Sequence, residues 1–492
     1  MRVTTVVDGE RWAQVANPDP FALPVWRSPV HRTPHWVIVA VQAARLICRL
    51  VRFLARHPIA SGAAALAAWI WVALGWPALA AIAGSLGLAL AAWRWRHPAS
   101  FTRFAGDPAR SQWRSWCYRR RWHAVMTIAG LSVTYRGRVV VPALGEVWAT
   151  AVIDRVVVRL VSGQSPADVA AKAEGIAHGF GVRLCRVRAA FPGAVVLELV
   201  RKDALAVPVP ALPIPRHADL RALPAGVRED GAPWLVRLAG THVLVAGDTG
   251  AGKASLLWGL VRAMLPAMAA GLVQVHAADP KLMELAYGRA IFEAYGSYSA
   301  SPAAIALMLE EQVKGMQERA ARFAGKRRDH QPTPDEPFVV IIVDEVAFLT
   351  AYQPDKRLRD RIMAALATLT TQGRAVGYAV VAALQDPRKE VLTIRNLFPD
   401  RIAMRLREKD QVDLVLGEGA RDRGALADLI PVDPADPSAG AGVAYVLLGG
   451  HPDPVRVRAG WVTDADITAM CAQYAPAPEL APGPRALEGA AR

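Results

Sequence analysis

The sequence has few cysteines and no apolar run at its start. Its four cysteines, Cys48, Cys117, Cys185 and Cys471, are far apart in a chain of 492 residues, and no two of them form a C-x-x-C pair. This spacing indicates neither a zinc site nor a disulfide framework. The first residues, MRVTTVVDGERW, carry acids where a secretory signal peptide would be apolar, so we expect no cleaved signal peptide.

Acidic residues are also in short supply. The chain has 43 Asp and Glu against 58 Lys and Arg, which gives a net charge of +15 and a sequence pI near 10.1. This balance predicts an anionic partner, which could be nucleic acid, lipid head groups or both. The length is sufficient for two or three domains with a sizeable core.

Charge is absent altogether from Pro58 to Trp93. One straight helix of this length would measure roughly 54 Å, whereas the hydrocarbon layer of a bilayer is roughly 30 Å thick. The sequence Gly75-Trp76-Pro77 interrupts the run near its middle, so we expect two transmembrane spans joined by a tight turn. A buried alanine-rich helical pair in a soluble protein is the alternative, which the basic borders of the run disfavour.

Arginines border the uncharged run on both sides. By the positive-inside rule, this pattern places both ends of the predicted hairpin in the cytoplasm. The arginines before the run fall on one face of a predicted helix that would lie on the inner leaflet. After the run, arginine is interleaved with tryptophan in residues 94–121, which suits an anionic membrane interface and could also contact DNA phosphates. The arginines are Arg45, Arg49, Arg52 and Arg56 before the run, and Arg94, Arg96 and Arg103 after it.

The middle of the chain predicts a small α+β module over residues 122–206. Residues 152–161 alternate like a strand, a helix begins after the capping Ser165, and a hairpin turns at Pro192-Gly193. We find no catalytic constellation in this module. The proline-rich residues 207–220 predict a stiff, extended linker at a domain boundary.

The segment GDTGAGKAS closely matches the phosphate-loop pattern G-x-x-x-x-G-K-[ST]. Residues before it predict a strand and residues after it predict a helix, so backbone N–H groups would face phosphates while Lys253 reaches the β and γ oxygens. Ala254 occupies the place of the hydroxyl that normally holds Mg²⁺, and Ser255 could contribute through water or a shifted helix start. The residues predicted to bind ATP are Gly247, Asp248, Thr249, Gly250, Ala251, Gly252, Lys253, Ala254 and Ser255.

Two further strands end in polar side chains. The apolar run from Val339 to Val343 predicts a buried parallel strand that delivers Asp344 and Glu345 to the edge of the sheet where ligands bind. We expect Asp344, with Ser255, to hold Mg²⁺, and Glu345 to polarise the attacking water. A third strand ends at Gln385, which could sense the γ-phosphate. The predicted catalytic residues are Glu345, Lys253 and Gln385, and the predicted metal ligands are Asp344 and Ser255.

The order of these motifs resembles the FtsK/SpoIIIE family of membrane-anchored DNA translocases. The resemblance covers roughly residues 235–460, through GDTGAGKAS, DPKLMELA, VIIVDEVAFL, GRAVGYAVVAALQDP and FPDRIAMRL, and is greatest to the transfer proteins of actinobacterial conjugative plasmids and integrative elements. It implies a RecA-like domain, a ring that is hexameric, and ATP-driven movement of double-stranded DNA. Gly247, Gly252 and Lys253 match the family's phosphate loop, Asp344 and Glu345 its acidic pair, and Gln385 its glutamine.

Beyond Ala254, the chain departs from this family in two places. Asp413 stands where members usually carry an arginine that acts on the neighbouring subunit, so that arginine is unassigned. The residues after the last predicted strands are too few for the family's usual winged-helix DNA reader, which we therefore do not expect. The candidates for the missing arginine are Arg374, Arg405, Arg407 and Arg421.

Together these patterns predict an α/β protein of the inner membrane with a cytoplasmic RecA-like P-loop motor that binds ATP, Mg²⁺ and double-stranded DNA. Two alternatives stay open: a motor of the same superfamily acting on single-stranded DNA or secreted protein, and a membrane scaffold that does not hydrolyse ATP. The predicted divisions are a cytoplasmic segment 1–57, a transmembrane hairpin 58–93, a basic border 94–121, an α+β module 122–206, a linker 207–220, the motor 221–475 and a disordered tail 476–492.

Overall fold

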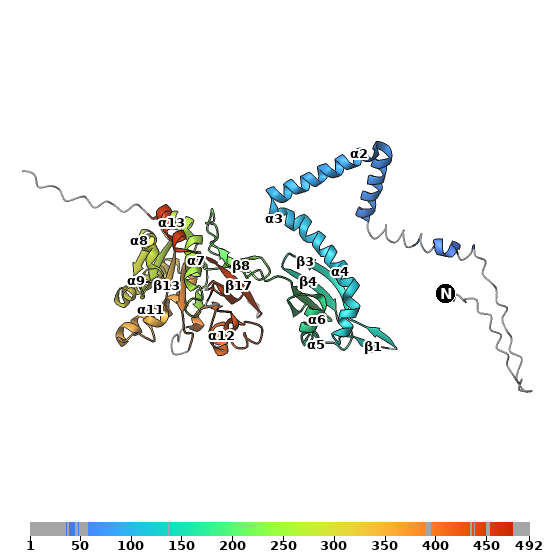
Figure 1. Cartoon of the computed structure of the whole chain (residues 1–492). Helices are drawn as coiled ribbons and strands as arrows, with labels where there is room; N and C mark the ends of the chain where they lie inside the picture. The colour runs from blue at the N-terminus through green and yellow to red at the C-terminus, as the bar shows by residue number, and fades with distance from the viewer. Residues whose placement is uncertain are drawn as a thin grey trace, which may run out of the picture. The chain divides into compact units, whose positions relative to one another are not determined.

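The computed structural model describes residues 58–475 except 136, 389–394, 433–434, 437 and 449–452, together with Trp36, residues 39–44 and Cys48 (Figure 1). Apart from Cys48, the amphipathic helix expected from Arg45 to Arg56 lies outside the described residues, and so does the tail expected at 476–492. The chain divides into two compact units, Met1–Thr102 and Arg103–Arg492.

In the first unit, the uncharged run forms the long helix α2, Pro58–Arg96, which is broken at Gly75 (Figure 1). Gly75 has φ 77° and ψ 171°, a conformation that glycine adopts at low cost and that cannot continue a helix. Ala65–Arg96 is long and apolar enough to cross a membrane, and 6% of its most apolar window is buried. The described residues therefore contain one candidate span, and the pair of spans stays a prediction.

The second unit begins with a four-stranded antiparallel sheet in the order β3-β4-β6-β5. Helices α4 and α6 contribute side chains to the core on one face of this sheet, and Gly179 lets them approach closely because a Cβ there would lie 2.6 Å from Val125 Cγ1. The predicted strand and hairpin are confirmed as β4 and as β5 with β6. The elements are α4 Asp107–Ile128, β1 Val133–Tyr135, β2 Arg138–Val140, β3 Ala143–Ala149, β4 Ile153–Arg159, α5 Pro166–Ala170, α6 Ala173–Phe180, β5 Leu184–Ala189 and β6 Ala194–Val200.

Helix α4 runs through the module boundary that the sequence predicts at residue 122. Its side chains Tyr118, Trp122 and Met126 are buried in the module core. The Tyr118 hydroxyl donates a hydrogen bond of 2.5 Å to Asp154, which also accepts one of 2.6 Å from Arg201 Nε. Residues 107–121, which the sequence assigns to the basic membrane border, therefore belong to a helix of the module.

The rest of the unit is built on a mixed sheet that has eleven strands among the described residues, the eleventh being the short β7, Val209–Pro210, which pairs with β17. Its core is parallel, in the order β12-β11-β13-β14-β10-β15, and the antiparallel strands β16, β17, β8 and β9 extend it. Of the parallel strands, β10, β13 and β14 are buried along their whole length, as their continuous apolar sequences predict. The strands are β8 Leu223–Arg228, β9 Pro233–Val236, β10 Val243–Ala246, β11 Val273–Ala278, β12 Gly296–Ser299, β13 Phe338–Val343, β14 Tyr378–Leu384, β15 Asp400–Met404, β16 Val443–Leu447 and β17 Pro454–Trp461.

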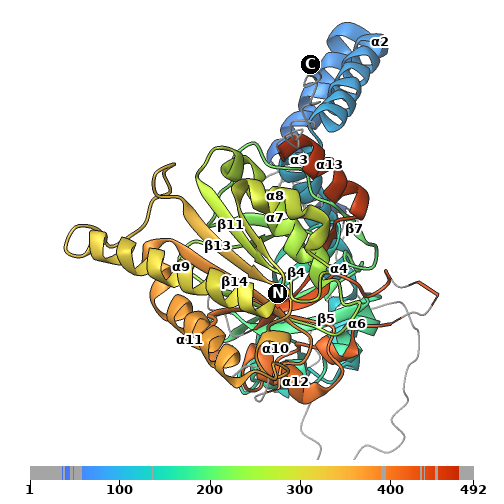
Figure 2. The same ribbon diagram turned by 90° about the vertical axis from the view of Figure 1, so that its left-hand side faces the viewer.

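Helices cover both faces of this sheet (Figure 2). Alternate residues of each strand divide between two cores: Val340 and Ile342 of β13 pack toward α7, α8 and α13, whereas Val339 and Ile341 pack toward α9, α11 and α12. This arrangement is a three-layer α/β fold, which confirms the predicted class. The helices are α7 Lys253–Ala269, α8 Arg289–Tyr295, α9 Pro302–Phe323, α10 Val346–Leu349, α11 Lys356–Gln372, α12 Lys409–Leu416 and α13 Asp464–Tyr474.

The proline-rich residues 207–220, predicted as a stiff, extended linker, contact the α/β domain at two points. Val209 and Pro210 form a short strand, β7, that pairs in parallel with Gly460 and Trp461 of β17. The carbonyl of Leu212 accepts a hydrogen bond of 2.7 Å from Arg262 Nε of α7. The segment is therefore part of the wall of the α/β domain.

Candidate nucleotide site

The phosphate-loop residues form the turn between the end of β10 and the start of α7. Gly250 and Gly252 have φ values of 70° and 95°, which favour glycine. A Cβ at Gly247 would lie 2.8 Å from Met404 Cβ, and one at Gly252 would lie 2.5 Å from the backbone nitrogen of Gly442. The glycines thus let the loop pass close to β15 and to the turn before β16, and the first amides of α7, which have no intrahelical acceptors, lie at its end.

Lys253, the first residue of α7, folds back over this loop. Its Nζ donates hydrogen bonds of 2.7 Å to the carbonyl of Gly247 and 3.2 Å to that of Asp248. Burial lowers the pKa of Lys253, and the nearby carboxylates of Glu345 and Asp344 oppose this shift. The Lys253 ammonium is therefore held against the loop whose amides the sequence predicts to bind phosphate.

The predicted acidic pair follows β13 and lies beside the loop. Burial raises the pKa of Asp344 to about 7, and the neighbouring carboxylates of Asp279 and Glu284 add to the shift. Glu345 caps the N-terminus of α10: its Oε1 accepts from the Ala347 amide at 3.3 Å, and its Oε2 accepts from Lys281 Nζ at 3.2 Å. Hydrogen bonds thus fix the Glu345 carboxylate, whereas the Asp344 carboxylate lies among like charges.

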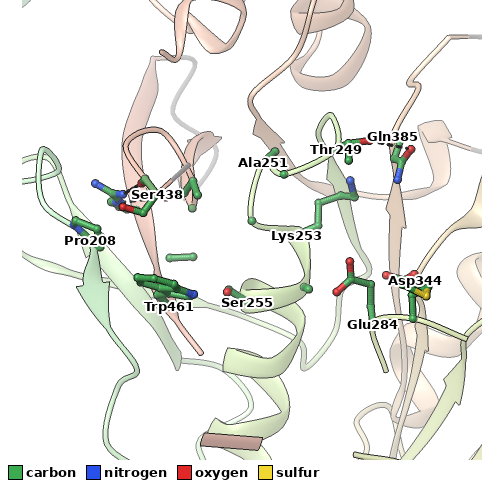
Figure 3. Close-up of a pocket in the computed structure, with 18 of the residues that line it drawn as sticks. Pro208, Thr249, Ala251, Lys253, Ser255, Glu284, Asp344, Gln385, Ser438 and Trp461 are labelled. Atoms are coloured by element: carbon green, nitrogen blue, oxygen red, sulfur yellow. Dashed lines mark hydrogen bonds between the residues drawn. The ribbon is translucent and has the colours of Figure 1, made fainter. Parts of the chain in front are cut away.

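Gln385, at the end of β14, joins the two motifs. Its backbone amide donates to Glu345 Oε1 at 3.4 Å, and its side-chain oxygen lies 3.5 Å from Thr249 Oγ1 of the phosphate loop. All three predicted catalytic residues and both predicted metal ligands line one cavity of about 710 Å³ (Figure 3). The structure therefore brings the sequence-predicted site residues together, and their roles stay predictions.

The residues around the cavity are compatible with Mg²⁺. Among the described residues, no group of three or more His, Cys, Asp or Glu side chains is arranged to enclose a metal ion. Phosphate-bound Mg²⁺ does not require such a group, because it is usually held by one or two carboxylates together with phosphate oxygens and water. Asp344 and Ser255 line the same cavity, and the carboxylates around Asp344 favour a cation there.

Sequence reasoning missed two groups of lining residues. Lys281 and Glu284 lie in the DPKLMELA motif, which carried the family resemblance without any role being assigned to its members. The opposite wall contains Pro208, Arg458 and Trp461, which have no motif. The position of an Arg or Trp in a strand gives no indication that it lines a pocket, so the sequence offered no signal for this wall.

Each candidate for the missing trans-acting arginine has a partner within its own chain. Arg407 forms a two-point ion pair with Asp248 of the phosphate loop, both contacts being 2.9 Å, and Arg405 donates to the Thr249 carbonyl at 2.6 Å. Arg374 donates to the carbonyl of Gly240 at 2.9 Å, and Arg421 pairs with Asp428. The arginine stays unassigned.

Asp413, the residue in the expected place of the arginine, has a local structural contact. Its Oδ1 accepts the backbone amide of Arg421 at 2.9 Å and so secures the turn after α12. The departure from the family pattern thus serves the fold of this turn.

A glycine-rich turn between a parallel strand and a helix, a lysine bound to that turn, and an acidic pair at the end of the next strand but one in the sheet define a P-loop ATPase. Residues 201–421 match the family model FtsK/SpoIIIE family, and residues 90–201 match that of the Actinomycete conjugal transfer protein N-terminal domain. Residues 201–421 therefore form a domain of the FtsK/SpoIIIE type, preceded by a region of the conjugal transfer type, as the motifs indicated.

The similar proteins include a transfer protein and DNA translocases. Transfer protein TraSA of Streptomyces ambofaciens is 28% identical over 370 residues, which are 67% of this chain and 83% of that protein. DNA translocase FtsK of Listeria monocytogenes is 26% identical over 244 residues, 46% of this chain and 30% of the translocase. This chain thus spans about a third of that translocase. Among solved structures, the pCW3 conjugation coupling protein TcpA with ATPγS is 17% identical, with a TM-score of 0.43, over 70% of this chain and 97% of that one.

Proposed function

We propose that this chain is a membrane-anchored ATPase that moves double-stranded DNA during transfer of a conjugative plasmid or integrative element. The observation that carries the proposal is the single cavity in which Lys253, Asp344 and Glu345 meet the phosphate loop, in a chain similar to a transfer protein over most of its length. The net charge of +15 supports a polyanionic partner.

The chain's own residues suggest how ATP would be hydrolysed. Lys253 would exchange its bonds to the loop carbonyls for the β and γ oxygens of ATP, and Asp344 and Ser255 would hold Mg²⁺, which neutralises charge on the phosphates. Glu345, oriented by the Ala347 amide and Lys281, would accept a proton from the attacking water. Gln385 would contact the γ-phosphate and report its loss to β14.

The expected ring, hexameric in the family, would place the substrate duplex in a central channel. A basic run, Lys326 to Arg328, follows α9 and is a candidate DNA contact. Arg327 is paired with Glu336 at 3.6 Å, so part of this charge is already neutralised. We expect phosphate contacts to dominate affinity, so that log affinity falls linearly with log salt.

Stimulation of ATP hydrolysis by nucleic acid tests the proposal. We expect duplexes of unrelated sequence to stimulate the full-length protein similarly, and single strands of equal length to stimulate it less, at one fixed salt concentration. Stronger stimulation by single strands would favour a single-strand pump, and ATP binding without any turnover would favour a scaffold. A preference of a hundredfold for one short duplex sequence would reveal a sequence reader.

Reporter fusions test the membrane topology. Fusions near residues 40 and 130 should both give cytoplasmic signals, and an insertion at Gly75 should be accessible from outside, if α2 forms two spans. A signal from outside the cytoplasm at residue 130 would establish a single span and contradict the proposed orientation of the motor.

A further inference from the structure

The nucleotide cavity extends well beyond the phosphate loop. In Figure 3, Lys253, Asp344 and Gln385 lie on one side of the cavity, Trp461 and Pro208 lie on the other, and Ser255 lies between them. The cavity volume of about 710 Å³ is within the range of sites that enclose a whole small molecule. Binding of phosphates alone would leave the side around Trp461 unused.

Trp461 presents a large apolar side chain to the side of the cavity that lies opposite Lys253. It is the last residue of β17 and is 51% exposed, although its neighbours Ala459 and Gly460 are buried. Its backbone is paired with Pro210 of β7, and Pro208 and Val209 line the same part of the cavity. The indole and these aliphatic side chains form an apolar shelf, defined here as Trp461, Pro208 and Val209.

Hydrogen bonds hold this shelf at a fixed position relative to the phosphate loop. The amide of Gly442 donates to the Ala251 carbonyl at 2.8 Å, and the amide of Ala459 donates to the Gly442 carbonyl at 2.8 Å. Strand β17 is thereby tied to the phosphate loop through one glycine. A rigid ligand with a phosphate end and a flat apolar end would match this pre-organised pair of surfaces.

The polar neighbour of the shelf is already committed to the fold. Arg458 is 1% exposed, and its guanidinium donates to the carbonyls of Leu205 at 2.8 Å and Ala441 at 3.1 Å, and also to that of Ser438. Arg458 is therefore occupied in joining the segment before β7 to the turn before β16. What the shelf offers a ligand is chiefly a flat apolar surface.

We infer that the shelf binds the nucleobase of the nucleotide, with the base stacked on Trp461. Stacking on an aromatic side chain requires only a flat π surface, and a purine offers more of it than a pyrimidine. The inference rests on the proposed ATP site and adds to it the residues that bind the base. It also gives the segment before β8 a part in nucleotide binding.

The test compares a nucleotide with its phosphates alone. Binding of a non-hydrolysable ATP analogue and of inorganic tripolyphosphate, both with Mg²⁺, would be measured by calorimetry on the full-length protein and on Trp461→Ala. We expect Trp461→Ala to weaken binding of the analogue by about 10-fold to 100-fold, equivalent to about 1.4–2.7 kcal/mol, and to leave tripolyphosphate binding unchanged. Trp461→Phe, which keeps an aromatic ring, should recover most of the affinity.

Trp148 provides a matched control, because it is 52% exposed and lies on β3 of the module, outside the cavity. Trp148→Ala should bind both ligands like the parent. Equal weakening of both ligands by Trp461→Ala, or weakening of neither, would overturn the base-binding role. If neither ligand bound the parent, or if Lys253→Ala bound both normally, the proposed ATP site itself would fail.

Discussion

Two buried carboxylates in this molecule have opposite surroundings. Asp154, in the module, accepts hydrogen bonds from Tyr118 and Arg201, and Arg114 lies 3.7 Å away. Asp344, at the end of β13, lines a cavity and has Asp279 among its close carboxylate neighbours. A buried charge that is neutralised within the chain stabilises one arrangement, whereas a buried charge among like charges beside a cavity favours a ligand of opposite sign.

The largest effect is expected on the rate of ATP hydrolysis when the Glu345 carboxylate is removed. Glu345→Gln should reduce the rate of ATP hydrolysis by about 10²-fold to 10⁴-fold while ATP still binds, because it removes the base and leaves Lys253 in place. Steady-state hydrolysis and nucleotide binding would be measured on the same preparation. Lys253→Ala should instead weaken binding.

Glu310→Gln is a suitable control, since Glu310 forms an exposed ion pair with Arg361 outside the cavity. It should hydrolyse ATP like the parent. Unchanged turnover in both Glu345→Gln and Lys253→Ala would mean that the site is assigned to the wrong residues.

The next-largest effect is expected on the stability of the fold, where removing Asp154 and removing Asp344 should act in opposite directions. Asp154→Ala should lower the free energy of unfolding by about 3–5 kcal/mol, because it leaves the buried Tyr118 hydroxyl and the partly buried Arg201 guanidinium without their shared acceptor. Asp344→Asn should raise the unfolding midpoint in the absence of nucleotide, because it removes a charge from a cluster of like charges. Thermal unfolding of both variants measures the difference. If both changes were destabilising by the same amount, the contrast between the two sites would be wrong.

A smaller, pH-dependent effect is expected at His276 of β11. Burial lowers the pKa of His276 to about 4, and its ring nitrogen lies 2.8 Å from Ser297 Oγ. Because the folded pKa is below the unfolded value near 6.5, the unfolded state binds more protons, and the stability present above pH 6.5 is lost as pH falls toward 4.

His276→Gln should therefore show a smaller drop in unfolding midpoint between pH 7.5 and pH 5 than the parent. The exposed His217 provides the comparison, and His217→Gln should behave like the parent. An unchanged drop in His276→Gln would show that other groups set the acid sensitivity. His242, which burial also shifts to a pKa of about 4, is the first to test in that case.

The sequence predicted the phosphate half of the cavity because its determinants are local. The spacing from Gly247 to Lys253 and the apolar run before Asp344 each specify a strand end, and parallel strands bring their carboxyl ends to one edge. The shelf could not be predicted, because Pro208 and Trp461 meet only through the pairing of β7 with β17. Likewise, α4 belongs to the module because Tyr118 reaches Asp154, a contact between distant residues that no local pattern encodes.

The smallest effect, and the one that decides an open assignment, is expected at Arg407. The Arg407 side chain in its ion pair with Asp248 is largely exposed, and exposed pairs contribute little because solvent screens them. If this contact only steadies the phosphate loop, Arg407→Ala should change ATP affinity and turnover by at most about fivefold. A trans-acting arginine contributes about 10³-fold or more to turnover. If Arg407→Ala lost that much turnover and still bound ATP, Arg407 would have to leave Asp248 and act on the neighbouring subunit. Arg407 would then be the trans-acting arginine that family members usually carry at the place of Asp413.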